Sequence, residues 1–186
     1  MNDENIKKIV EDLVATFLYA GQVALDLRDK GLKKKMKSDN TPVSNGDIKV
    51  NEILTTKIKT LTPKLPIISE ESSENKDKKN LNDFWLIDPI DGTYDYINNL
   101  EEFTINAGLI ITNKPVAGLI NAPAKKRMFY SYEIGNAFEL SGRKKINLSN
   151  LTTKKKENLK FVSYSNKLKP EIQKIYDDLG VKENIR

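Results

Sequence analysis

The spacing of apolar residues changes near residue 62, and this change restricts the chain to a fold in which helices come first and a sheet follows. Before it, apolar residues recur every three or four positions through two segments, 6–27 and 48–61. That spacing is typical of amphipathic helices. We expect the first helix to end near Gly31 and the second to end before Pro63.

The part of the chain after this change consists of short apolar runs separated by turn-forming residues. The runs have the length and composition of strands, and breaks such as NKP and IGN between them are typical of an antiparallel meander. The expected strands lie in residues 65–69, 84–88, 101–112, 114–123, 126–133 and 136–142. Two helices packed on such an antiparallel sheet make an α+β domain, with Trp85 in its core.

The composition and the expected secondary structure change once more near residue 157. A lysine run leads there into a strand-like segment, 159–165, and then into a helix-like one, 169–180. We therefore divide the chain into an α+β domain, 1–156, and the incomplete start of an α/β second domain, 157–186. The new strand would leave a sheet edge unpaired, so the sequence keeps open self-association into a homo-oligomer.

The composition excludes several kinds of site. The 186 residues contain neither cysteine nor histidine, which removes disulfides, thiolate nucleophiles and histidine general bases. The net charge of +5 comes from scattered lysine runs without interleaved aromatic residues, which argues against a nucleic-acid partner. No stretch approaches the roughly 18 apolar residues of a membrane span, and the N-terminus is too acidic for a signal peptide. We therefore expect a cytoplasmic protein.

The stretch WLIDPIDGTYDY, residues 85–96, carries the strongest chemical signal. Asp88 ends an apolar strand, Pro89 turns the chain, and Asp91 stands three residues after Asp88. Two carboxylates at one turn repel each other, and this cost disappears when they share a divalent cation. Glu70 follows the preceding predicted strand and would face Asp88 if the two strands are neighbours. These oxygen ligands favour a Mg²⁺ site.

The residues after Asp91 indicate what the cation would act on. Gly92 lets an anion approach the backbone, and N–H groups at the start of a helical turn from Thr93 would hold a phosphate. Pro89 fixes the turn and leaves the Ile90 carbonyl to point inward. Together these parts describe metal-assisted hydrolysis of a phosphate ester.

These motifs resemble, in their order along the chain, a known family. SEE at 69–71, WLIDPIDGT and EEFTINAGLI are similar to the inositol monophosphatase superfamily of Mg²⁺-dependent, lithium-sensitive phosphatases. TPVSNGDIKVNEIL, LPIISEE and GLINAPAKKRMFYS are more similar to its 3'(2'),5'-bisphosphate nucleotidase branch than to the inositol phosphatases. The resemblance implies the layered α/β/α/β/α sugar-phosphatase fold, whose first domain is the α+β part, and a Mg²⁺-dependent phosphomonoesterase.

The resemblance also implies a set of metal ligands. Glu70, Asp88 and the Ile90 carbonyl would hold one Mg²⁺. Asp88 and Asp91 would help to hold a second ion, and Glu70 would face a third. The structural alternative for the two aspartates is an Asx-type turn. Asp95 is expected to stay outside the site, as a carboxylate favoured by the helix dipole.

A catalytic pair is implied by the same resemblance. Thr93, paired with Asp47, would orient and activate the attacking water, and the backbone of Gly92 and Thr93 would contact the phosphate. Asp47 stands at capping-box spacing after Ser44, so it would also cap the second helix, and Thr93 has a structural alternative as a helix cap. Glu71 would support the ligands, and its alternative is a solvated carboxylate.

The substrate that the resemblance implies is adenosine 3',5'-bisphosphate, hydrolysed to AMP and phosphate, with an inositol phosphate as the alternative. Family members continue into a second domain with a W-D motif, whose aspartate completes the second metal site. This sequence has no such segment, and its only tryptophan is Trp85. We therefore expect a C-terminally shortened member, for which the alternative to an active phosphatase is a non-catalytic relic that binds Mg²⁺ or a partner.

Overall fold

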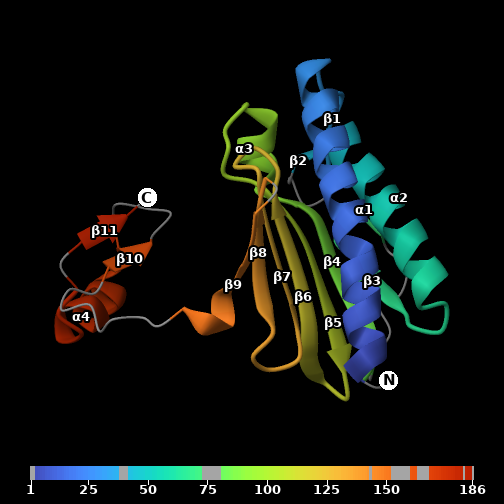
Figure 1. The fold of residues 1–186 in the computed structure, drawn as a ribbon. Helices are drawn as coiled ribbons and strands as arrows, with labels where there is room; N and C mark the ends of the chain where they lie inside the picture. The colour runs from blue at the N-terminus through green and yellow to red at the C-terminus, as the bar shows by residue number, and fades with distance from the viewer. Residues whose placement is uncertain are drawn as a thin grey trace. The chain divides into compact units, whose positions relative to one another are not determined.

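The computed structural model describes most of the chain, and it divides into two compact units (Figure 1). The first unit is Met1–Ser149 and the second is Asn150–Arg186. The described residues are 3–37, 42–72, 81–142, 144–151, 160–162, 168–181 and 183–185. The expected domain boundary between residues 156 and 157 lies outside them and stays a prediction.

The helices of the first unit include the two that the apolar spacing predicted. They are α1 (Asp3–Asp29) and α2 (Asn45–Leu61), and a five-residue helix, α3 (Thr93–Ile97), follows later. Between α1 and α2, two short strands pair antiparallel: β1 (Lys34–Met36) and β2 (Pro42–Ser44).

Both long helices end where their local sequence predicts. α1 is followed by Gly31, whose φ of 91° is the left-handed conformation common after helix ends. α2 ends at Leu61, two residues before Pro63. At its start, a capping box is formed by Ser44 and Asp47, as their spacing predicted.

Seven strands of the first unit form one sheet. Their order in the sheet is also their order in the chain: β3 (Ile67–Ser69), β4 (Phe84–Asp91), β5 (Thr104–Ile111), β6 (Lys114–Ala122), β7 (Arg127–Tyr132), β8 (Ala137–Ser141) and β9 (Lys144–Asn147). From β4 to β9 each strand pairs antiparallel with the next, which confirms the predicted meander. The β3–β4 pair is parallel, and the connection between the two strands, residues 70–83, has the length of a dozen or more residues that a parallel pair needs.

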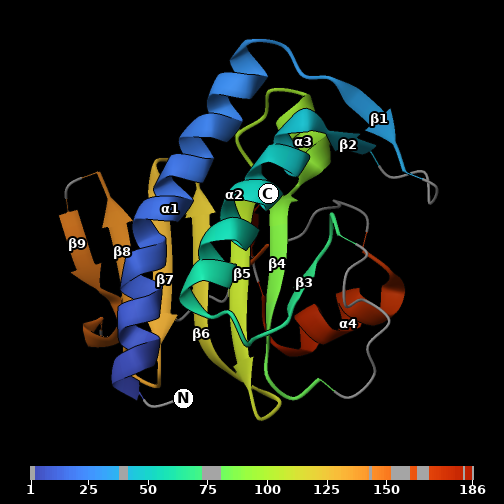
Figure 2. The same cartoon turned by 90° about the vertical axis from the view of Figure 1, so that its right-hand side faces the viewer.

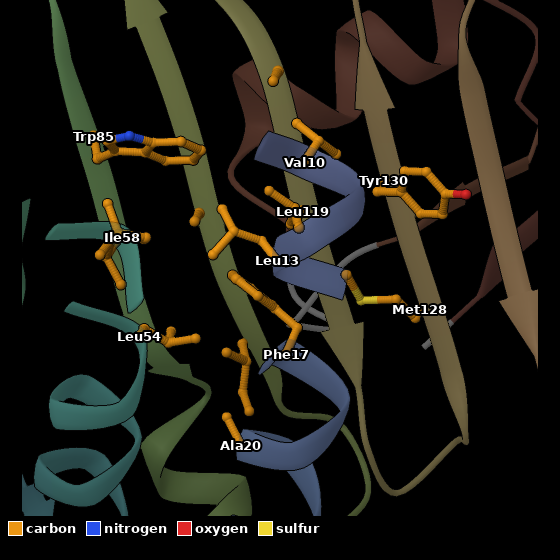
Figure 3. Close-up of a cluster of buried hydrophobic side chains, with 14 of the residues drawn as sticks. Val10, Leu13, Phe17, Ala20, Leu54, Ile58, Trp85, Leu119, Met128 and Tyr130 are labelled. Carbon is orange, nitrogen blue, oxygen red and sulfur yellow. The ribbon is translucent and has the colours of Figure 1, made fainter. Parts of the chain in front are cut away.

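α1 and α2 lie side by side over one face of this sheet (Figure 2). The residues that create the helical spacing are the ones that become buried there, including Leu13 and Phe17 of α1 and Leu54 and Ile58 of α2 (Figure 3). Burying one such side chain stabilises the fold by about 1.5–3 kcal/mol. The apolar contact with the sheet therefore holds the helices in place.

Trp85 lies in this core, as predicted, and ties β4 to α2. Its side chain is fully buried, and its indole N–H donates a hydrogen bond to Thr62 Oγ1 at 3.1 Å. The Thr62 hydroxyl donates in turn to the Ile58 carbonyl at 2.8 Å. The strand that carries the DPIDGT motif is thus fixed against the last turn of α2.

The second unit is a strand–helix–strand unit. It contains β10 (Lys160–Val162), α4 (Pro170–Asp178) and β11 (Glu183–Ile185), and the two strands pair parallel. The Phe161 ring stacks on the Tyr176 ring of α4 with centroids 3.9 Å apart. This arrangement matches the predicted start of an α/β domain. Within the described part of the chain, no helix has both the length and the apolar character that a membrane crossing requires.

Candidate functional site

β3 and β4 are paired neighbours that run in the same direction, so the residues that follow β3 lie beside the second half of β4. Ser69 is paired with Ile87, and the Glu70 N–H donates to the Ile87 carbonyl at 3.2 Å. A carboxylate follows each of the paired residues, Glu70 on one strand and Asp88 on the other. The register therefore makes neighbours of two carboxylates that lie 18 positions apart in the chain.

The sequence predicts that β4 ends at Asp88, and that prediction is wrong. β4 continues to Asp91, with an irregularity in its pairing between Asp88 and Asp91. Asp88 is paired with Asn106 and Asp91 with Thr104, so three steps along β4 face two steps along β5. One extra residue of this kind is a β-bulge, and Pro89, which has no N–H for the ladder, lies inside it. Side chains three apart in a regular strand point to opposite faces, so the bulge brings Asp91 to the face of Asp88.

The environment of Asp88 penalises its negative charge. Burial raises the pKa of Asp88 to about 7, and the charges of Glu70 and Asp91 add to the effect. Its Oδ1 atom is buried and has no hydrogen-bond partner within the described residues. An acceptor oxygen of this kind, set among other carboxylates, fits a hard cation that binds oxygen ligands.

The residue types of the site suit a metal ion, but their side chains are not arranged around one in this structure. As the side chains stand, no group of three or more His, Cys, Asp or Glu residues within the described part of the chain is arranged to hold a metal ion. In this arrangement Glu70 Oε1 is engaged by a cation of the protein itself, the Lys37 ammonium, at 3.0 Å.

Lys37 is a site residue that sequence reasoning missed. Its Nζ atom lies 2.6 Å from Glu71 Oε1, so it bridges the two consecutive glutamates at the end of β3. Glu71 is not the solvated carboxylate of the alternative interpretation, since only 8% of its side chain is exposed and burial raises its pKa. No local signal marks Lys37, because it belongs to a lysine-rich connector with many equivalent lysines.

Asp47 uses its two carboxylate oxygens for different partners. Oδ2 accepts hydrogen bonds from the Ser44 N–H at 2.8 Å and from the Ser44 hydroxyl at 2.6 Å, which completes the capping box of α2. Oδ1 accepts a hydrogen bond from the Thr93 hydroxyl at 3.1 Å. The capping role and the pairing with Thr93 therefore coexist in one buried side chain.

Thr93 is the first residue of α3 and does not cap it. The N-cap position is Gly92, and no side chain makes a capping bond there, so the helix-cap alternative for Thr93 is wrong. Its hydroxyl also lies 3.0 Å from the Ile90 carbonyl. A hydroxyl has one proton, so Thr93 can donate to Asp47 or to Ile90 but not to both at once.

Gly92 permits the sharp entry into α3. Its φ of 88° is left-handed, and a Cβ atom there would lie 2.8 Å from the Glu102 carbonyl oxygen. Asp95 lies in the first turn of α3, the position where the helix dipole favours a carboxylate.

Tyr96 explains why the starts of α2 and α3 meet. It is fully buried, its hydroxyl donates to the Ala24 carbonyl of α1 at 2.7 Å, and its ring fills the space that a side chain at Gly46 would need. Gly46 immediately precedes Asp47 in the first turn of α2. Tyr96 thus joins three helices next to the Thr93–Asp47 pair.

The structure brings the predicted site residues together from α2, β3, β4 and α3. Three contacts connect them in pairs: Glu70 with β4 at Ile87, Asp47 with Thr93, and Thr93 with Ile90. Their roles as ligands, catalytic residues or phosphate contacts stay predictions.

Comparison with known proteins identifies related sequences. The sequence model described as the inositol monophosphatase family matches residues 5–182. The protein named 3'(2'),5'-bisphosphate nucleotidase CysQ of Aggregatibacter actinomycetemcomitans is 32% identical over 133 residues, which are 70% of this chain and 49% of that protein. The protein of the same name from Buchnera aphidicola is 34% identical over 149 residues, 77% of this chain and 56% of that protein. The chain thus matches about half the length of these relatives.

Solved structures share the fold. The crystal structure of CysQ from Bacteroides thetaiotaomicron superimposes with a TM-score of 0.71 at 24% identity, covering 98% of this chain and 72% of that one. A staphylococcal IMPase complexed with products superimposes with a TM-score of 0.75 at 18% identity, covering 100% of this chain and 67% of that one. At these identities the likeness concerns the fold alone.

Proposed function

We propose that this chain, which belongs to the inositol monophosphatase family, carries the cation site and the water-activating pair of a Mg²⁺-dependent phosphomonoesterase. The observation that carries the proposal is the Asp47–Thr93 hydrogen bond next to the DPID bulge. It joins a buried carboxylate of α2 to a hydroxyl of α3, and that hydroxyl also lies 3.0 Å from the Ile90 carbonyl of β4, the strand whose Asp88 has an unpartnered buried oxygen. That combination has the parts that metal-assisted phosphate ester hydrolysis needs.

The cation ligands in this proposal come from two adjacent strands. Glu70, Asp88 and the Ile90 carbonyl would hold one Mg²⁺, Asp88 and Asp91 would help to hold a second, and Glu70 would face a third. The bound cations would neutralise the clustered carboxylates, polarise the phosphate and acidify bound water. Lys37 would have to release Glu70 when a cation takes up that carboxylate.

Thr93 and Asp47 would handle the proton of the attacking water. If the Ile90 carbonyl turns to a cation, the Thr93 hydroxyl keeps Asp47 as its acceptor, because the two acceptors compete for one proton. The hydroxyl oxygen can then accept a hydrogen bond from water and pass its proton toward the Asp47 carboxylate. The backbone of Gly92 and Thr93 would contact the phosphate.

The substrate that we propose is adenosine 3',5'-bisphosphate, cleaved to AMP and phosphate. It is supported by the relatives named 3'(2'),5'-bisphosphate nucleotidase at 32–38% identity. An inositol phosphate is the second candidate, supported by the family match and by the fold shared with the staphylococcal IMPase.

The deciding experiment measures phosphate release by the purified chain from adenosine 3',5'-bisphosphate and from inositol 1-phosphate, each with Mg²⁺ and with EDTA. We expect Mg²⁺-dependent release that favours the nucleotide. Release that is equal with EDTA would contradict the metal site, and a preference for inositol 1-phosphate would reassign the substrate. Mg²⁺ binding without release from either compound would favour the non-catalytic alternative.

A further inference from the structure

We propose that Asn106 of β5 is a positioning residue for the Asp91 carboxylate, and this proposal rests on the proposed cation site. Asn106 Nδ2 donates a hydrogen bond to Asp91 Oδ2 at 3.2 Å. Nothing in the local sequence of β5 marks Asn106 as a site residue, since it lies in an ordinary apolar strand, TINAGLII. The contact depends on how β4 and β5 are paired.

The register places Asn106 between the two aspartates. It is the cross-strand partner of Asp88, while Asp91 is paired with Thr104 two positions away on β5. Cross-strand partners point to the same face of a sheet, so Asn106 leaves the sheet beside Asp88. From there its amide reaches Asp91 across the bulge.

A second observation marks the same place. Within the described residues, three buried side-chain atoms have no hydrogen-bond partner, and two of them are Asp88 Oδ1 and Asn106 Oδ1. These two oxygens belong to facing residues of adjacent strands. Buried polar atoms are nearly always satisfied, so two unpartnered acceptors at one point of the sheet call for a donor or a cation there.

The chemistry of asparagine suits this position. An amide N–H donor can fix a carboxylate without adding a charge to the site, whereas lysine or arginine would neutralise it and compete with a cation. Groups that hold metal ligands in place typically matter about 10- to 100-fold in metal affinity. We therefore expect Asn106 to influence cation binding more than the rate at saturating cation.

The test compares two substitutions in the 186-residue chain, Asn106→Val and Asn106→Thr, whose new side chains have nearly the same size and shape. Both suit a strand, and only threonine keeps a hydrogen-bond donor. Ser131→Ala is the matched control. Ser131 lies on the same face of the sheet through the register Asn106↔Ile120↔Phe129, two positions further along β7, and no contact joins it to the site in the described residues. Circular dichroism and thermal unfolding check that each variant is folded.

The readout is Mg²⁺ binding by calorimetry, which needs no turnover. Asn106→Val should raise the dissociation constant for Mg²⁺ about 10- to 100-fold. The dissociation constant of Asn106→Thr should lie between those of Asn106→Val and the unaltered chain. Ser131→Ala should leave it unchanged. Where the chain turns over substrate, the Mg²⁺ concentration for half-maximal rate should rise more than kcat falls. Unchanged Mg²⁺ binding by folded Asn106→Val would overturn the role of Asn106 alone. Absence of Mg²⁺ binding by the unaltered chain would overturn the cation site and this role together.

Discussion

Thr93 and Asp47 are joined by a 3.1 Å hydrogen bond although they lie 46 residues apart, at the first turns of two different helices. Asp47 is oriented for this contact by Ser44, which occupies its other oxygen. The start of α2 and the proposed catalytic pair therefore depend on the same carboxylate.

Removal of the Thr93 hydroxyl tests this pair. Thr93→Val should lower turnover about 100- to 10,000-fold, the usual range for a lost general acid–base contribution, while Mg²⁺ binding changes little. Steady-state kinetics and calorimetry on the same preparation check both expectations. Ser44→Ala is the comparison, because it removes the cap of α2, at a cost of about 1 kcal/mol, and one of the two bonds that orient Asp47, but keeps the Thr93 hydroxyl. Its turnover should fall less than that of Thr93→Val. Equal loss of turnover in Ser44→Ala would show that the capping box, and not the hydroxyl, is what matters.

Asp88→Asn tests the cation site. The substitution keeps the size of the side chain and removes one negative charge, and the charge of the ligands governs the affinity of hard-cation sites. We expect Mg²⁺ affinity to fall about 100-fold or more in a calorimetric titration. Asp95→Asn, in the first turn of α3, is the matched control and should bind Mg²⁺ as the unaltered chain does. Identical titrations for all three proteins would contradict the assignment of Asp88.

The pKa of Asp88, raised to about 7 by burial and by neighbouring carboxylates, predicts two pH effects. Protons compete with the cation, so Mg²⁺ affinity should rise as pH increases through about 7. In EDTA, where no cation is bound, the free energy of unfolding should instead fall as pH increases. The folded chain holds the Asp88 proton more tightly than the unfolded chain, so this contribution is present below about pH 4 and is lost as pH rises to about 7.

Urea unfolding in EDTA at a series of pH values measures that second effect. Because the Asp88 side chain is only half-buried, solvent screens the repulsion and the slope should be shallow. The amide of Asp88→Asn does not titrate in this range, so this variant should lack the slope. An unchanged pH dependence in the variant would assign the effect to other groups.

Gly92→Ala tests the close approach at the entry of α3. Gly135 provides a matched control, because its φ of 87° is almost the same as the 88° of Gly92 but a Cβ atom there would meet nothing within 4 Å. Gly135→Ala should cost about 1 kcal/mol for the left-handed conformation alone. Gly92→Ala should cost more, about 2–4 kcal/mol, because the methyl group would also collide with the Glu102 carbonyl. Equal midpoints in urea for the two variants would mean that the loop at Glu102 gives way freely.

The parts of the site that lie within a short stretch of sequence could be predicted. The capping box at Ser44 and Asp47, the turn at Gly92 and the helical start at Thr93 depend on neighbouring residues, and their sequence signals are specific. The order of helices and strands followed from the change in hydrophobic spacing in the same way.

The parts that depend on strand register could not be predicted. The parallel pairing of β3 with β4, the bulge between Asp88 and Asp91, and the reach of Asn106 to Asp91 are set by contacts between segments distant in sequence. Lys37 was missed for another reason. A lysine in a polar connector has many conformations available, and only the tertiary placement of Glu70 and Glu71 selects it from its neighbours.

Trp85, the single tryptophan of the chain, also serves as an intrinsic fluorescence probe of the strand that carries the site. Its buried indole lies on β4 three residues before Asp88, and its N–H is bonded to the end of α2. All tryptophan emission from this protein therefore originates in the strand that carries both aspartates. A shift of that emission toward longer wavelengths marks the entry of water into β4, so a single fluorescence trace records when the bulge and its carboxylates lose their support.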